Sequence, residues 1–140
     1  MILPSLYSEI EGPALKNIVK ILSNNKFLNH ITIGLDKANK TQFQDAKIFF
    51  KDLKVPHSVI WNDGPRMKSL DKQLSEQGLA PKEPGKGKNV WYCMGYTYSR
   101  NEAKAIALHD CDIITYTREL LARLVYPVAN PNFNYEFCKG

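Results

Sequence analysis

Short apolar runs alternate with segments of helical periodicity along the chain, and this alternation constrains the fold more than any other feature. The apolar runs that read as strands lie at 2–6, 30–35, 57–61, 105–108 and 133–138. Alternation of this kind is typical of sheets that are mostly parallel, with a helix in each crossover. We therefore predict an α/β fold, a mostly parallel open sheet with helices on both faces, in a single domain spanning 1–140.

The helices are predicted from apolar spacing and capping residues. Leu15, Ile18, Val19 and Leu22 recur at helical intervals after Pro13, which suits a first helical position. Further helices are expected at 41–53 and 117–125, capped by Thr41 and Thr117, at 66–78, and at 89–100. In the 89–100 helix, the residues expected to face inward are Val90, Trp91, Met94 and Tyr98. The segment 79–88 holds two prolines and two glycines and is expected to lack regular structure.

Composition excludes several classes of function. No apolar run approaches the roughly 18 residues of a membrane span, and no N-terminal signal pattern is present, so a cytoplasmic protein is expected. The three cysteines are widely spaced, which favours neither a disulfide framework nor a zinc site. The net charge of +5 is compatible with an anionic ligand. The lysines lack an interleaved aromatic and basic face, so nucleic-acid binding is not expected.

An acidic motif, Asp110-Cys111-Asp112, follows the apolar run 105–108, which reads as a buried strand. Two carboxylates at the carboxyl end of such a strand need a partner, and ligands bind α/β sheets at this end. Magnesium and manganese ions prefer carboxylates, water and substrate phosphates as ligands. The motif therefore predicts a divalent metal site, although an aspartate that merely caps a turn is the alternative interpretation.

A second motif, Pro84-Gly85-Lys86-Gly87, stands just before a predicted helix. Its glycines let the backbone approach a ligand, Lys86 adds a positive charge, and the helix N-terminus attracts anions. Together these features would cradle a diphosphate, whereas a flexible basic loop is the alternative. The P-loop and G-x-G-x-x-G patterns are both absent, so a dinucleotide site is not expected.

The order of the motifs is more specific than any one of them. A strand ending Leu-Pro-Ser-Leu is followed by Asp36 after the second strand, by Pro-Gly-Lys-Gly-x-x-x-Trp, and by a strand ending Asp-Cys-Asp. This order resembles the GT-A family 2 glycosyltransferases, and within them the glucosyl-3-phosphoglycerate synthase group. The resemblance covers nearly all 140 residues and implies the N-terminal, nucleotide-sugar-binding part of that fold.

The resemblance also implies roles for individual residues. Asp110 and Asp112 would be catalytic, with Asp110 on the ribose or donor sugar and Asp112 on Mg²⁺ or Mn²⁺. Asp36 would lie near the base, and Gly85 and Lys86 near the uracil or the phosphates. The residues expected against the nucleoside, in the loop after the first strand, are Pro4, Leu6, Ser8 and Glu9. Asn-Glu is commoner in the family where Tyr7-Ser8 stands here, and paired acids are commoner after the second strand.

The implied activity is metal-dependent transfer of a hexose, with UDP-glucose as donor and a small phosphorylated acceptor such as 3-phosphoglycerate. The acceptor half of the fold is expected to be absent from these 140 residues, so the chain alone could bind the donor without completing transfer. The resemblance also hints at a homodimer. Two alternatives remain. One is a non-catalytic nucleotide-binding or assembly module. The other is a sugar-phosphate nucleotidyltransferase, which normally carries a glycine-rich loop that 4–9 lacks.

Overall fold

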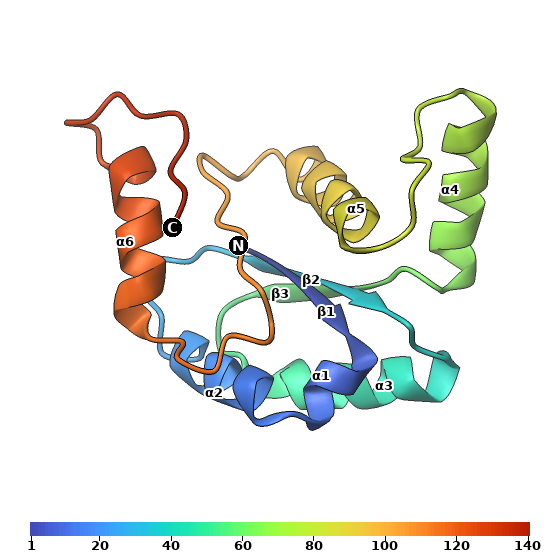
Figure 1. Cartoon of the computed structure of the whole chain (residues 1–140), viewed down its shortest axis with the longest axis horizontal. Helices are drawn as coiled ribbons and strands as arrows, with labels where there is room; N and C mark the ends of the chain where they lie inside the picture. The colour runs from blue at the N-terminus through green and yellow to red at the C-terminus, as the bar shows by residue number, and fades with distance from the viewer.

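A three-stranded parallel sheet forms the centre of the molecule in the computed structural model, which describes all residues 1–140 (Figure 1). Its strands, in spatial order, are β1 (Ile2–Leu6), β2 (Ile31–Asp36) and β3 (His57–Trp61). The register pairs Leu6 with Asp36, so the carboxyl ends of β1 and β2 lie side by side. The predicted α/β fold with a parallel open sheet is confirmed.

Six α-helices and one short 3₁₀-helix surround this sheet. They are α1 (Tyr7–Glu11), α2 (Pro13–Leu22), α3 (Lys40–Phe49), η1 (Phe50–Asp52), α4 (Pro65–Glu76), α5 (Lys86–Ser99) and α6 (Arg118–Ala129). In Figure 1, α1, α2 and α3 lie along one face of the sheet and α5 lies across the other. Helices on both faces were predicted, and this arrangement confirms the prediction. None of the helices combines the length and the apolar character that crossing a membrane would require.

The apolar side chains of α2 lie where their periodicity in the sequence predicts them. Leu15, Ile18 and Leu22 are completely buried, and they belong to the same core cluster as Leu3 and Ile33 of the sheet. Burial of one such side chain is worth about 1.5–3 kcal/mol relative to exposure, so this face fixes α2 on the sheet. Helix α3 begins differently from the prediction, because Asn39 rather than Thr41 is its cap. Asn39 Oδ1 accepts from the Gln42 N–H at 2.9 Å.

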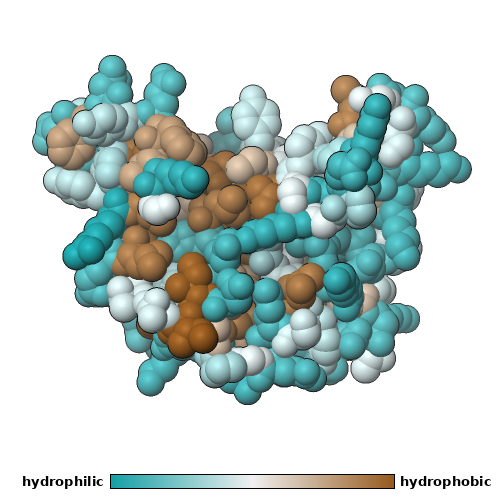
Figure 2. Space-filling model, viewed as in Figure 1, coloured by the Kyte–Doolittle hydropathy of each residue, from teal (hydrophilic) through white to brown (hydrophobic).

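The segment 105–108 is not the buried strand that its apolar run predicts. It makes one parallel bridge to β1, in which the Ile2 N–H donates to Ala107 O at 2.7 Å and the His109 N–H donates to Ile2 O at 3.2 Å. The next rung of a parallel ladder would need an N–H from Pro4, which has none, so pairing stops there. Ile106 and Leu108 are 42% and 40% exposed. Figure 2 shows apolar side chains gathered over this part of the surface, between α5 and α6.

Helix α5 turns a different face to the sheet from the one predicted. Trp91, Met94 and Tyr98 are exposed, so their predicted inward orientation is wrong. The buried residues of α5 are Asn89, Tyr92, Cys93 and Thr97. This face is partly polar because it hydrogen-bonds the sheet: Thr32 Oγ1 and Thr97 Oγ1 lie 3.0 Å apart. Apolar periodicity cannot detect a contact of that kind.

Three other expectations need correction. The loop expected at 4–9 contains helix α1, which starts at Tyr7. The run 133–138 forms no strand. Helix α6, which Thr117 caps as predicted, continues through Pro127 to Ala129 instead of ending at residue 125.

Candidate functional site

The two motifs that the sequence singles out meet in the folded chain. The Lys86 ammonium, in the first turn of α5, forms an ion pair with the Asp110 carboxylate, which follows the single bridge to β1. Both side chains are about half exposed, at 54% and 49%, so a ligand can reach them. Helix α5 begins at Lys86, earlier than predicted, and its N-terminal positive dipole therefore lies at the same place.

Gly85 caps this helix in a conformation that requires glycine. The φ of Gly85 is 115°, in the region that side-chain-bearing residues rarely adopt. Two residues later, Gly87 leaves open space, because a Cβ added there would meet no atom within 4 Å. The backbone at the start of α5 is therefore open to an approaching anion, and its role in holding a diphosphate stays a prediction.

Asp36, at the carboxyl end of β2, is held by two amide side chains. Asn62 Nδ2 donates to Asp36 Oδ1 at 2.8 Å, and Asn89 Nδ2 donates to Asp36 Oδ2 at 3.0 Å. Neither asparagine was predicted from the sequence. Asn89 stands three residues after Lys86 in α5, and Asn62 directly follows β3. These positions, close to a predicted site residue and at the end of a strand, are the signal that could have indicated them.

The residues predicted against a nucleoside lie in β1 and α1, and none of them forms a hydrogen bond or ion pair with the side chains of Lys86 or Asp110. Pro4 is buried within β1, and Leu6 is half-buried. Glu9 Oε2 accepts a hydrogen bond from the Leu6 N–H at 2.8 Å, so its carboxylate caps the N-terminus of α1. Ser8 is exposed to solvent.

Buried side chains anchor the acidic motif. Cys111 is 1% exposed, and burial raises the pKa of its thiol to about 12, so it is protonated at neutral pH. His109 is also buried, and burial lowers its pKa even though Asp110 acts in the opposite direction. Its ring packs edge-on against Tyr116, with centroids 5.3 Å apart. These groups hold Asp110 and Asp112 at the surface on either side of a buried cysteine.

The acidic residues do not form a ready-made metal cage. No group of three or more His, Cys, Asp or Glu side chains is arranged to hold a metal ion. Asp110 is engaged with Lys86, whereas the Asp112 side chain is exposed. A single exposed carboxylate at Asp112, two residues after Asp110, fits an ion such as Mg²⁺, which takes most of its ligands from substrate phosphates and water.

Another acidic side chain, Asp71, which the sequence did not single out, joins α4 to α5. Lys88 Nζ lies 2.6 Å from Asp71 Oδ1, and the Tyr92 hydroxyl donates to the same oxygen. The pKa of Asp71 is lowered by its hydrogen bonds from Lys88 and Tyr92, so Asp71 is ionised at neutral pH. Lys88 is thus occupied by a structural contact, which leaves Lys86 as the lysine of this turn that faces Asp110.

Comparison with known proteins gives two curated relatives. The chain is 46% identical over 140 residues to a glucosyl-3-phosphoglycerate synthase of Persephonella marina, and 40% identical over 141 residues to one of Methanococcoides burtonii. Both matches cover the whole chain, which spans 35% and 34% of the length of these relatives. No protein-family model and no solved structure matches. The resemblance predicted from the motifs is thereby confirmed, because the chain is similar along its whole length to proteins named glucosyl-3-phosphoglycerate synthase.

Proposed function

We propose that this chain is the donor-binding part of a glycosyltransferase that transfers glucose from UDP-glucose to a small phosphorylated acceptor such as 3-phosphoglycerate. The observation that carries the proposal is the contact between Lys86 and Asp110, which unites the glycine-lysine motif and the acidic motif at one end of the sheet. The names of the two curated relatives give the reaction class and the acceptor. The carboxyl ends of parallel strands are also where nucleotides bind open α/β sheets.

The chemistry follows from the charges in this region. Lys86 and the N-terminus of α5 would take the diphosphate, because both attract anions. When the diphosphate draws Lys86 away, Asp110 becomes free to accept hydrogen bonds from the ribose or donor-sugar hydroxyls. Asp36 would accept from the base, and Pro4, Leu6, Ser8 and Glu9 would line the nucleoside at the end of β1.

Asp112 would hold a divalent cation, Mg²⁺ or Mn²⁺, which when bound supplies positive charge beside the departing nucleoside diphosphate. An exposed carboxylate with no competing ion pair suits this role better than Asp110, which Lys86 already neutralises. The protein's own contribution is to fix Asp112 in place, since the neighbouring Cys111 is buried and anchors the loop.

Calorimetric titration of UDP and GDP, with and without Mn²⁺, tests the proposal on the wild type and on Asp112→Ala. We expect UDP to bind more tightly with Mn²⁺, and Asp112→Ala to remove that metal dependence. Asp52→Ala is the matched control, because it removes an exposed carboxylate from η1, outside the candidate site. Absence of nucleotide binding, or metal-dependent binding that persists in Asp112→Ala, would contradict the proposal.

A further inference from the structure

We infer that Asn62 and Asn89 are positioning residues of the donor site, which fix the Asp36 carboxylate in the orientation that receives the nucleotide. The inference rests on the proposed function, because it assigns Asp36 to nucleotide binding. Neither asparagine is expected to touch the reacting atoms. Their effect on binding would pass entirely through Asp36.

The two amides hold Asp36 from different elements. Asn62, just after β3, donates to Oδ1 at 2.8 Å, and Asn89, on α5, donates to Oδ2 at 3.0 Å. A carboxylate bonded through one oxygen can still rotate about its side-chain torsion, whereas donors on both oxygens fix its plane. An ionised carboxylate accepts about four hydrogen bonds, so roughly two acceptor positions remain for a ligand.

Asn89 is itself locked. Its Nδ2 also donates to Gly34 O at 2.9 Å, and its Oδ1 accepts from Cys93 Sγ at 3.4 Å. Only 3% of Asn89 is exposed. Flipping or rotating the Asn89 amide would break hydrogen bonds of both its nitrogen and its oxygen, so Asn89 presents one fixed donor to Asp36.

Asn62 is placed by the sheet. Its backbone N–H donates to Leu35 O at 3.0 Å, which continues the pairing of β2 with β3 by one step. Its side chain makes no protein hydrogen bond other than the one to Asp36. Truncating Asn62 therefore removes a single interaction and leaves the backbone contact intact, which makes this residue the cleaner of the two to test.

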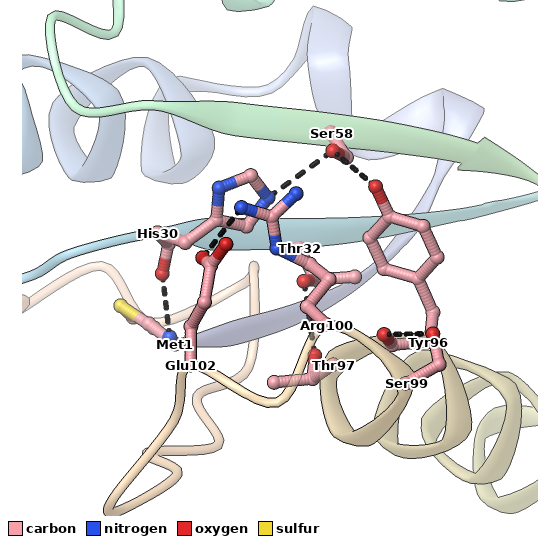
Figure 3. A network of polar contacts seen from close by, with 9 residues as sticks. All are labelled: Met1, His30, Thr32, Ser58, Tyr96, Thr97, Ser99, Arg100 and Glu102. Atoms are coloured by element: carbon pink, nitrogen blue, oxygen red, sulfur yellow. Dashed lines mark hydrogen bonds and ion pairs between the residues drawn. The ribbon is translucent and has the colours of Figure 1, made fainter.

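Helix α5 is also pinned at its far end, so it is a rigid support for Asn89. Figure 3 shows Ser58 between His30 and Tyr96, with Ser58 Oγ 3.1 Å from His30 Nε2 and 2.8 Å from the Tyr96 hydroxyl. Thr32 and Thr97 form a further contact between β2 and α5. Sites carried on elements fixed at both ends keep their geometry better than sites on loops.

The same helix turn holds the second acidic group. Lys86 and Asn89 are three residues apart and therefore lie on one face of α5, where Lys86 contacts Asp110 and Asn89 contacts Asp36. In the free chain, the first turn of α5 thus contacts both carboxylates. Asn89 keeps its contact with Asp36 when a diphosphate draws Lys86 away from Asp110.

A double-mutant cycle tests the inference on the 140-residue chain by calorimetric titration of UDP with Mn²⁺. Asn62→Ala is expected to weaken UDP binding about tenfold, because one charge-assisted hydrogen bond that orients Asp36 is lost. In the Asp36→Ala background the same change is expected to weaken binding no further, since there is no carboxylate left to orient. Asn62→Asp is expected to weaken binding more than Asn62→Ala, because it places a second carboxylate against Asp36.

Asn89→Ala provides a second arm of the cycle, with thermal unfolding measured alongside because Asn89 is buried. Asn29→Ala is the control, since this asparagine is exposed and makes no side-chain hydrogen bond, and it is expected to bind UDP as the wild type does. Equal weakening by Asn62→Ala with and without Asp36 would overturn the positioning role, as would unchanged binding in Asp36→Ala. If the wild type binds neither UDP nor GDP, the proposed function itself fails and the positioning role falls with it.

Discussion

Gly34 of β2 lies so close beneath Asn89 of α5 that a Cβ added to the glycine would stand 1.8 Å from Asn89 Oδ1. The same Cβ would stand 2.6 Å from Cys93 Sγ. The absence of a side chain at this one position allows α5 to approach the sheet, and only at that separation can Asn89 reach both Gly34 O and Asp36.

Gly34→Ala should therefore displace α5 and destabilise the fold. Overpacking of this kind costs about 1–3 kcal/mol in the free energy of unfolding, which urea denaturation measures. The matched control is Gly95→Ala, a helical glycine whose added Cβ would meet nothing within 4 Å. That substitution should stabilise the chain by about 0.5–1 kcal/mol, because alanine favours the helix. A Gly34→Ala variant as stable as the wild type would show that α5 can shift freely.

The ion pair between Lys86 and Asp110 should matter for binding and little for stability. Both side chains are about half exposed, and such pairs contribute at most about 1 kcal/mol to folding. Lys86→Gln should thus unfold at nearly the wild-type urea concentration while binding UDP about tenfold more weakly, since a charged donor to the diphosphate is lost.

Lys82→Gln is the control for that measurement, because it removes the same charge from an exposed position in the segment before α5. It should leave the affinity for UDP within about twofold of the wild type, because screened surface charges act weakly over distance. Equal losses of affinity in Lys82→Gln and Lys86→Gln would mean that net charge, rather than the position of Lys86, attracts the nucleotide.

Tyr92→Phe should loosen α4. This helix has no buried residue, and its Asp71 receives the Tyr92 hydroxyl and Lys88. Burial, together with the hydrogen bond to Asp71, raises the pKa of Tyr92, so the hydroxyl remains a donor through neutral pH. We expect faster amide hydrogen exchange in α4 and a loss of about 1 kcal/mol in stability. Tyr98→Phe is the control, since Tyr98 is 85% exposed, and unchanged exchange of α4 in both variants would contradict this role.

The sequence was sufficient to predict the elements whose apolar residues face one side. The strands β1 and β2 and the helix α2 follow from such patterns, because each buries apolar residues in one core, and β3 packs against that core through the half-buried Val59 and Trp61. The inner face of α5 could not be found in this way. Its contacts with the sheet use Asn89, Thr97 and a glycine on the partner strand, whereas Trp91, Met94 and Tyr98 of that helix are exposed.

The candidate site was predictable in its motifs but not in its contacts. The sequence indicated Lys86, Asp36 and Asp110 separately, and the structure places Lys86 against Asp110. The partners of Asp36 escaped notice because a single asparagine has no distinctive pattern in a sequence. The run 105–108 makes one bridge, from Leu108 to Ile2, and the missing N–H of Pro4 keeps that pairing from extending past His109.

His109→Phe should stabilise the chain and weaken its dependence on pH. Both ring nitrogens of His109 are buried without a hydrogen-bond partner, so the imidazole loses hydration on folding and regains nothing. Phenylalanine fills a similar space and can keep the edge-on contact with Tyr116, and a gain of about 1–2 kcal/mol is expected at neutral pH.

Burial lowers the pKa of His109 below its ordinary value of 6.5, so the unfolded chain binds the proton more readily than the folded chain. The contribution of His109 to stability should be fully present above pH 6.5 and should be lost as the pH drops through the lowered pKa. Urea denaturation at a series of pH values should give a shallower fall in His109→Phe. The remaining fall comes from His30, whose pKa burial also lowers, and from the Met1 ammonium, whose pKa burial lowers to about 6. Parallel curves for the two proteins would show that His109 takes up its proton as easily in the folded chain as in the unfolded one.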